Sequence, residues 1–81
     1  MSYHEVVSEF GRITTDFFVC SGKPCIRGMR VTVAMIVEAT AAGRGAADLL
    51  NDFPYLEAED IREALSCAGA LAQGNETQLV R

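Results

Sequence analysis

The sequence predicts a mainly α-helical fold, in which three helices follow a short N-terminal β arm. Two observations predict it. From residue 33 onward, apolar residues recur at intervals of three and four, which is the period of a helix with one buried face. Before residue 32, short β-prone segments alternate with glycine and proline turns. The 81 residues suit one domain, with the arm at about 12–31, the helical part at about 32–72 and a tail at 73–81.

The arm is expected to contain two strands. Residues 12–15 are β-prone, and residues 18–20 can continue this first segment. Residues 21–24 have the composition of a turn, and residues 25–27 form the second expected strand. Glycine tolerates a positive φ and proline fixes its own φ, so the shape of the arm depends on Gly22, Pro24 and Gly28.

Each expected helix has a start or stop signal. The first follows Thr32, a suitable N-cap, and ends at Gly43. The second covers about residues 46–53 and is stopped by Pro54. The third runs from about residue 57 to residue 72, and its expected inward-facing residues are Ile61, Ala64, Leu65, Ala68, Leu71 and Ala72. Helices joined by such short turns are compatible with a helix-turn-helix-like unit.

The residue inventory argues against several functional classes. Three cysteines and the single His4 do not give the paired ligands of a zinc site, so we expect reduced thiols and no metal. One histidine near the N-terminus offers no nucleophile–base pair, so we expect no enzyme and no cofactor. The chain contains no apolar stretch of membrane-spanning length and no cationic leader at its start, which predicts a cytoplasmic protein.

Charge is distributed unevenly along the chain. The net charge is −4, but residues 1–44 sum to +1 and residues 45–81 sum to −5. The acids Glu57, Glu59, Asp60 and Glu63 lie at the start of the third expected helix, where they would repel DNA phosphates. The candidate DNA-binding residues are therefore on the arm and in the turn after the first helix, namely Lys23, Arg27, Arg30 and Arg44. Alternatively, the arm's cations pair with the acids of the third helix, within one protomer or across a dimer.

Two segments of the chain resemble a known family. They are GKPCIRGMRVTV at residues 22–33 and LLNDFPYLEAEDIREALSCA at residues 49–68, separated by a helix that ends at Ala42–Gly43. The chain closely resembles the small bacterial proteins catalogued as domain of unknown function 433, from residue 13 to about residue 72. The matching positions are Gly22, Lys23, Pro24, Ile26, Arg27, Gly28, Arg30, Val33, Gly43, Pro54, Leu56, Asp60, Ile61, Ala64, Leu65 and Ala68.

The chain also departs from the family pattern. Gly45 and Glu57 stand where the family usually has a serine or threonine that would cap the next helix. Phe17 and Phe18 replace a proline-containing turn, which exposes two aromatic rings to packing or to a partner.

The resemblance implies a function. It implies the antitoxin of a type II toxin–antitoxin pair, which neutralises a PIN-like ribonuclease and represses its own operon as a homodimer bound to operator DNA. Since PIN-like sites are lined with carboxylates and depend on metal, a cation from the antitoxin could block one; Arg81, Arg27 and Arg30 are the candidates. With Phe17 and Phe18, Arg81 forms the expected partner-binding set. The alternative is a non-catalytic interaction and dimerisation module that does not bind DNA.

Overall fold

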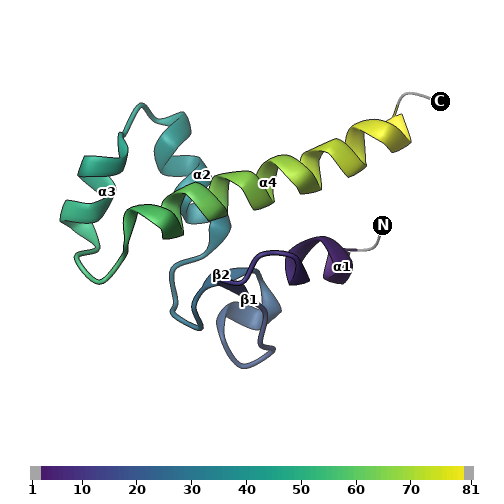
Figure 1. The fold of residues 1–81 in the computed structure, drawn as a ribbon, viewed down its shortest axis with the longest axis horizontal. Coiled ribbons are helices and arrows are strands. Elements are labelled where there is room, and N and C mark those ends of the chain that lie inside the picture. The colour runs from purple at the N-terminus through teal and green to yellow at the C-terminus, as the bar shows by residue number, and fades with distance from the viewer. Residues whose placement is uncertain (1–2, 80–81) are drawn as a thin grey trace.

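The computed structural model describes residues 3–79 and the side chains of residues 6–73 (Figure 1). The described part is mainly α-helical with one two-stranded antiparallel sheet near the N-terminus, which confirms the predicted fold class. In chain order, its elements are α1 (Tyr3–Ser8), β1 (Ile13–Thr14), the 3-10 turn η1 (Cys20–Gly22), β2 (Cys25–Ile26), α2 (Val33–Ala41), α3 (Ala46–Asp52) and α4 (Ala58–Leu79).

The β arm has the two expected strands, but residues 18–20 do not continue the first one, because β1 ends at Thr14 and Cys20 begins the turn η1. Ile13 of β1 pairs with Ile26 of β2, and the strands run antiparallel. After β2 the chain turns back tightly, since the Met29 amide donates a hydrogen bond of 2.8 Å to the Ile26 carbonyl. The two central residues of this turn, Arg27 and Gly28, have φ values of +44° and +73°, as a type I′ turn requires. Arg27 is therefore held in a left-handed conformation that a non-glycine residue adopts at a cost.

The predicted start and stop signals of α2 are confirmed, whereas α3 begins without a side-chain cap. The Met35 amide donates to Thr32 Oγ1 at 3.0 Å, so Thr32 is the N-cap of α2. Gly43 follows α2 with a φ of +90°, the left-handed conformation that ends a helix. Gly45 has no side chain with which to cap α3, but Asp48 compensates by accepting a hydrogen bond of 3.0 Å from the Gly45 amide.

Helix α4 is longer and less deeply covered than the sequence predicted. The expected end at Ala72 is wrong, because the helix continues to Leu79 and includes most of the expected tail. No proline follows Ala72, and a single interior glycine weakens a helix without ending it. Among the expected inward-facing residues, Ile61 and Ala64 are buried, whereas Leu65 and Ala72 are exposed. Arg81 lies outside the described residues.

Helix α1 was not predicted. Its apolar residues Val6 and Val7 are buried, and the helix packs against α4. Figure 1 shows α1 and the arm on the same side of α4, while α3 lies near the start of α4. A helix of six residues is too short to produce a recognisable periodic pattern, so only burial against α4 reveals it.

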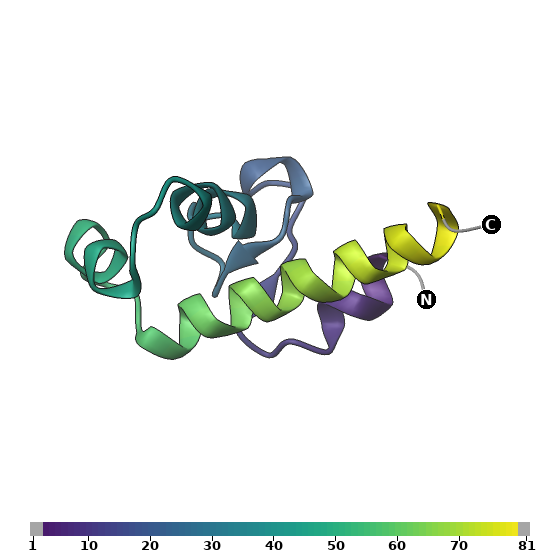
Figure 2. The ribbon, with the colours of Figure 1, turned by 90° about the horizontal axis from the view of Figure 1, so that it is seen from above.

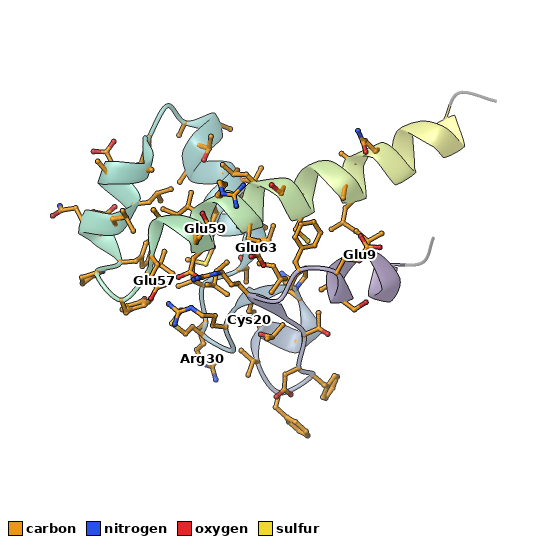
Figure 3. The ribbon with its side chains drawn as sticks, in the orientation of Figure 1. Glu9, Cys20, Arg30, Glu57, Glu59 and Glu63 are labelled. Carbon is orange, nitrogen blue, oxygen red and sulfur yellow. The ribbon has the colours of Figure 1, made fainter. Side chains whose placement is uncertain are left out.

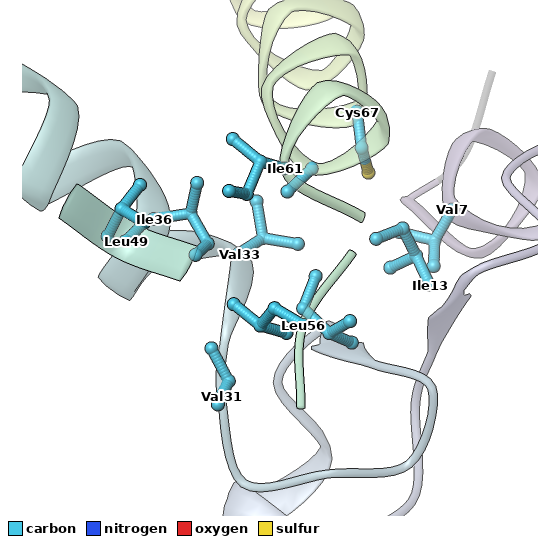
Figure 4. Close-up of a cluster of buried hydrophobic side chains, with 11 residues drawn as sticks. Val7, Ile13, Val31, Val33, Ile36, Leu49, Leu56, Ile61 and Cys67 are labelled. Carbon is cyan, nitrogen blue, oxygen red and sulfur yellow. The ribbon is translucent and has the colours of Figure 1, made fainter. Parts of the chain in front are cut away.

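The hydrophobic core lies where these elements meet α4. Figure 4 shows buried side chains converging from α1, β1, α2, α3 and α4. Since every α-helix and both strands contribute at least one of these residues, α4 acts as the spine against which the short elements pack. The cluster comprises Val7, Ile13, Ile26, Val31, Val33, Ile36, Leu49, Leu56, Ile61, Ala64 and Cys67.

Gly69 gives a test of how α4 is packed. A methyl group at this exposed position would meet nothing within 4 Å, so the glycine serves no close helix contact within the described structure. We expect Gly69→Ala to raise the free energy of unfolding by about 0.5–1 kcal/mol, because alanine favours the helix over the unfolded chain. The measurement is urea denaturation, with Gly43→Ala as the control that should lower stability owing to its positive φ. A destabilised Gly69→Ala protein would contradict the open packing of this face.

Candidate functional site

The centre of the candidate site is the carboxylate of Asp60, which is fully buried near the start of α4. Its Oδ1 accepts hydrogen bonds from Arg12 Nη1 at 2.9 Å and from Arg27 Nε at 3.0 Å. Its Oδ2 accepts from Arg27 Nη2 at 2.8 Å and from the Glu57 amide at 2.8 Å. The bond from Glu57 satisfies an amide in front of the first turn of α4, and the bidentate bond from Arg27 fixes the arm to that turn.

Arg27 also reaches the chain between α3 and α4. Its Nη2 donates to the Tyr55 carbonyl at 3.0 Å. In addition, the Arg27 amide donates to the Arg12 carbonyl at 2.8 Å, which joins the two arginines through the backbone. One side chain therefore connects the arm, the turn after α3 and the start of α4. These bonds offset the cost of the left-handed conformation of Arg27.

The second arginine, Arg12, neutralises further acids of α4. Its Nη1 donates to Glu57 Oε1 at 2.7 Å, and its backbone amide donates to Glu63 Oε1 at 2.8 Å. Figure 3 shows Glu57 and Glu63 on the side of α4 that faces the arm. Glu59 is paired separately with Arg62 in the same helix. Each acid that the sequence placed at the start of α4 therefore has a cationic partner within the chain.

The pKa values follow from these contacts. Burial by itself raises the pKa of Asp60, but hydrogen bonds from Arg27, from the Glu57 amide and from Arg12 outweigh it and lower the pKa to about 2. Hydrogen bonds to Glu57 and Asp60 raise the pKa of Arg12, and the bond to Asp60 raises that of Arg27. Asp60, Arg12 and Arg27 are therefore ionised at neutral pH.

The four expected DNA-binding residues are in different situations. Arg27 is turned onto Asp60, and Arg44 forms an ion pair with Asp52 of α3. Lys23 and Arg30 are exposed and form no ion pair with any described side chain. Figure 3 shows Arg30 at the outer edge of the arm, away from α4. Within one chain, therefore, the alternative pairing with the third helix is formed by Arg27 and, among the described residues, not by Lys23 or Arg30.

The other predicted site residues lie on the surface of the arm or in turns. Phe17 and Phe18 are 76% and 85% exposed and lie between β1 and η1. Gly22 has a φ of +82° and Gly28 has no neighbour near its missing side chain, so both positions depend on backbone conformation. Pro24 accepts a hydrogen bond of 2.9 Å from the Val33 amide, and Pro54 follows α3.

The sequence predicts this network only as an alternative, in which the arm's cations pair with the acids of the third helix. It assigns no role to Arg12, and it places Asp60 among the acids that would repel DNA phosphates. The position of Asp60 does carry a signal. It stands three residues after Glu57, the residue that precedes the helix, and an acid at this position can accept a hydrogen bond from the amide of that preceding residue. The sequence does not show that the arm and α4 are in contact, because Arg27 and Asp60 are separated by 33 residues along the chain.

The cysteines are free thiols. Cys25 and Cys67 are buried, and Cys20 is half-buried. Burial, together with Cys20, raises the pKa of Cys25 to about 11, and burial raises that of Cys67, so these two thiols are protonated at neutral pH. Within the described residues, no three histidine, cysteine, aspartate or glutamate side chains are grouped so that they could hold a metal ion.

Between residues 3 and 79, no helix combines the length and the apolar character needed to cross a bilayer.

The Asp60 network predicts a specific dependence of stability on pH. Because the folded pKa of about 2 lies below the ordinary value of 3.8, the carboxylate stabilises the folded state above about pH 4. This contribution is lost as the pH falls through the folded value. We expect Asp60→Asn to be less stable at pH 7 by about 2 kcal/mol, and the difference from wild type to shrink between about pH 4 and pH 2.

Urea denaturation of both proteins across this pH range gives the measurement. Taking the difference between wild type and variant removes the contribution of the other carboxylates. Glu59→Gln is the matched control, because it removes an exposed ion pair of the same helix and should change stability little. A difference between wild type and Asp60→Asn that is the same at pH 2.5 and pH 7 would contradict the assignment.

Comparison with known proteins identifies one family. A family model described as "Protein of unknown function (DUF433)" matches residues 13–68, which is most of the chain. The matched range contains both strands of the arm, Arg27 and Asp60. No curated protein and no solved structure matches the chain.

Proposed function

We propose that this chain, which belongs to the DUF433 family, is the antitoxin of a type II toxin–antitoxin pair. It neutralises a PIN-like ribonuclease in the cytoplasm and, as a homodimer, represses its own operon by binding operator DNA. The proposal starts from what the motif resemblance implies. The observation that supports it most is the state of the arm's cations, since Lys23 and Arg30 are exposed without acidic partners while Arg27 is held by Asp60.

The Asp60 network makes the arm compatible with a polyanion. Without Arg12 and Arg27, the first turns of α4 would present several carboxylates next to the arm. Pairing cancels much of that charge, so phosphates that approach Lys23 and Arg30 meet less repulsion. The same pairing fixes the arm, and a fixed arm presents its cations at constant positions. Arg44 would have to leave Asp52 in order to contact DNA, which makes it a weaker contact.

A cation from the same protein would block the toxin. A PIN-like site is lined with carboxylates that hold metal, so a guanidinium group delivered to it competes with metal or RNA. Arg27 is committed to Asp60, which leaves Arg30 as the candidate on the arm. The other candidate, Arg81, lies outside the described residues.

A second candidate function is supported by a separate observation. The exposed Phe17 and Phe18 rings form a pair of the kind found in protein interfaces. An interaction and dimerisation module that does not bind DNA would need this pair but would not need Arg30.

DNA binding is tested through its salt dependence. We expect the affinity of the dimer for DNA from upstream of its own gene to fall steeply with salt, because phosphate contacts release counterions. Arg30→Ala and Lys23→Ala should each reduce the slope by about one unit. Arg62→Ala is the control, because it removes a cation of α4 that pairs with Glu59 instead of extending from the arm. A flat salt response, or no binding alone and none with the toxin, would favour the interaction module.

Toxin binding is tested by copurification. We expect the tagged chain to copurify with the product of the adjacent reading frame, and we expect that product to be an acidic, PIN-like nuclease. The purified complex should lack the ribonuclease activity that the isolated toxin shows. If the neighbouring frame encodes no such protein and none copurifies, the antitoxin proposal is wrong.

A further inference from the structure

The two exposed phenylalanines form a rigid projection on the arm, which we call the Phe turn (Asp16–Val19). The Phe17 and Phe18 rings pack edge to face, with centroids 5.4 Å apart. Asp16 Oδ1 accepts from the Phe18 amide at 2.9 Å, and the Val19 amide donates to the Asp16 carbonyl at 2.9 Å. A projection that is already ordered loses little conformational entropy on binding. Two aromatic rings exposed in this way are typical of an interaction surface.

An apolar groove lies between α2 and α4. It has a volume of about 430 Å³, which is large enough to admit aromatic side chains. Its walls are mostly apolar side chains of the two helices, and Lys23 and Pro24 of the arm close one end. Figures 1 and 2 show that α4 extends well beyond α2. The helical residues that line it are Thr32, Val33, Ala34, Val37, Glu38, Ala68, Leu71 and Ala72.

The Phe turn and the groove complement each other in charge. Asp16 is exposed, and its Oδ1 is already bonded within the turn, so Oδ2 faces no described donor. Lys23, at the groove, forms no ion pair with a described side chain. A Phe turn seated in the groove with Asp16 beside Lys23 would pair these charges. The reverse orientation would place Asp16 towards Glu38 on the α2 wall, so the charges also select one orientation.

The positions of the two features favour a second copy of the same chain as the occupant. A Cβ at Gly22 would lie 3.8 Å from Phe17 Cα, and the next residue, Lys23, lines the groove. The Phe turn is thus beside the groove of its own chain, with its rings exposed to solvent. Two copies related by a two-fold axis can each seat a Phe turn in the groove of the other, and the contact then closes on itself as a dimer.

We propose that the chain forms a two-fold dimer in which each Phe turn occupies the α2–α4 groove of the other copy. The dimer gives the aromatic rings an apolar environment and pairs Asp16 with Lys23 across the interface. It rests on the proposed function only in that it supplies the homodimer and its paired arms. Its test requires neither DNA nor toxin, so its failure would leave toxin neutralisation open. A dimer of another arrangement would also leave the proposed homodimer intact, whereas a monomeric wild type would remove it.

Sedimentation of the purified full chain tests the dimer. We expect wild type to be dimeric, and Phe17→Ser/Phe18→Ser to weaken dimerisation by about 100-fold or more, since both copies of the contact are lost. Ala34→Glu should have a similar effect, because it places a carboxylate in the groove opposite Asp16. An acid in the first turn of α2 favours the helix, so this variant should fold, as circular dichroism and urea denaturation would show. Tyr55→Ser, which removes an aromatic ring that is 53% exposed elsewhere, is the matched control and should remain dimeric.

Mixing the two monomeric variants gives a second, independent readout. The serine variant keeps an intact groove, and Ala34→Glu keeps an intact Phe turn. We expect the mixture to form a one-to-one heterodimer through one remaining contact, more weakly than wild type. A wild type that is monomeric at every concentration overturns the proposal. A Phe17→Ser/Phe18→Ser or Ala34→Glu variant that dimerises like wild type also overturns it. The same holds for a folded wild type whose Phe turn binds only the toxin.

Discussion

The structure depends on one buried ionic contact, that of the Asp60 carboxylate with Arg27 and Arg12. The β arm consists of two strands of two residues each, which cannot be stable as an isolated hairpin. It holds its position because its apolar side chains join the core and because Arg27 fixes its turn to the start of α4. Asp60 bears a buried charge that only this arrangement can satisfy, so the arm and the helix specify each other's position.

The same contact separates the cations of the arm into two groups with different roles. Arg27 has a structural role, since it binds Asp60 and the Tyr55 carbonyl from a left-handed backbone conformation. Lys23 and Arg30 are on the outside of the fixed arm and are available to an external partner. The proposed DNA contact and the proposed dimer both use Lys23, because the first needs it as an exposed cation and the second pairs it with Asp16 of the other copy. Their competition for Lys23 would couple DNA binding to dimerisation.

Most of the fold was predictable, because local signals determine it. The two strands, the Thr32 cap, and the ends of α2 and α3 at Gly43 and Pro54 follow from turn chemistry and periodicity. Which residues of α4 are exposed was not predictable, since this depends on which neighbouring elements cover the helix. The candidate site was predictable only as a cationic segment. Whether Arg27 faces solvent or Asp60 depends on a contact between residues 33 positions apart in the sequence, and no local sequence pattern predicts such a contact.

The most direct test of this account is amide hydrogen exchange in wild type and Asp60→Asn. Two amides report on the arm, that of Ile26, which donates to the Val31 carbonyl, and that of Arg27, which donates to the Arg12 carbonyl. The Ile36 amide of α2 is the internal reference. If Asp60 fixes the arm to α4, both arm amides should lose protection in the variant by a larger factor than Ile36 does. Equal loss at all three amides, or unchanged protection of the arm, would contradict the account.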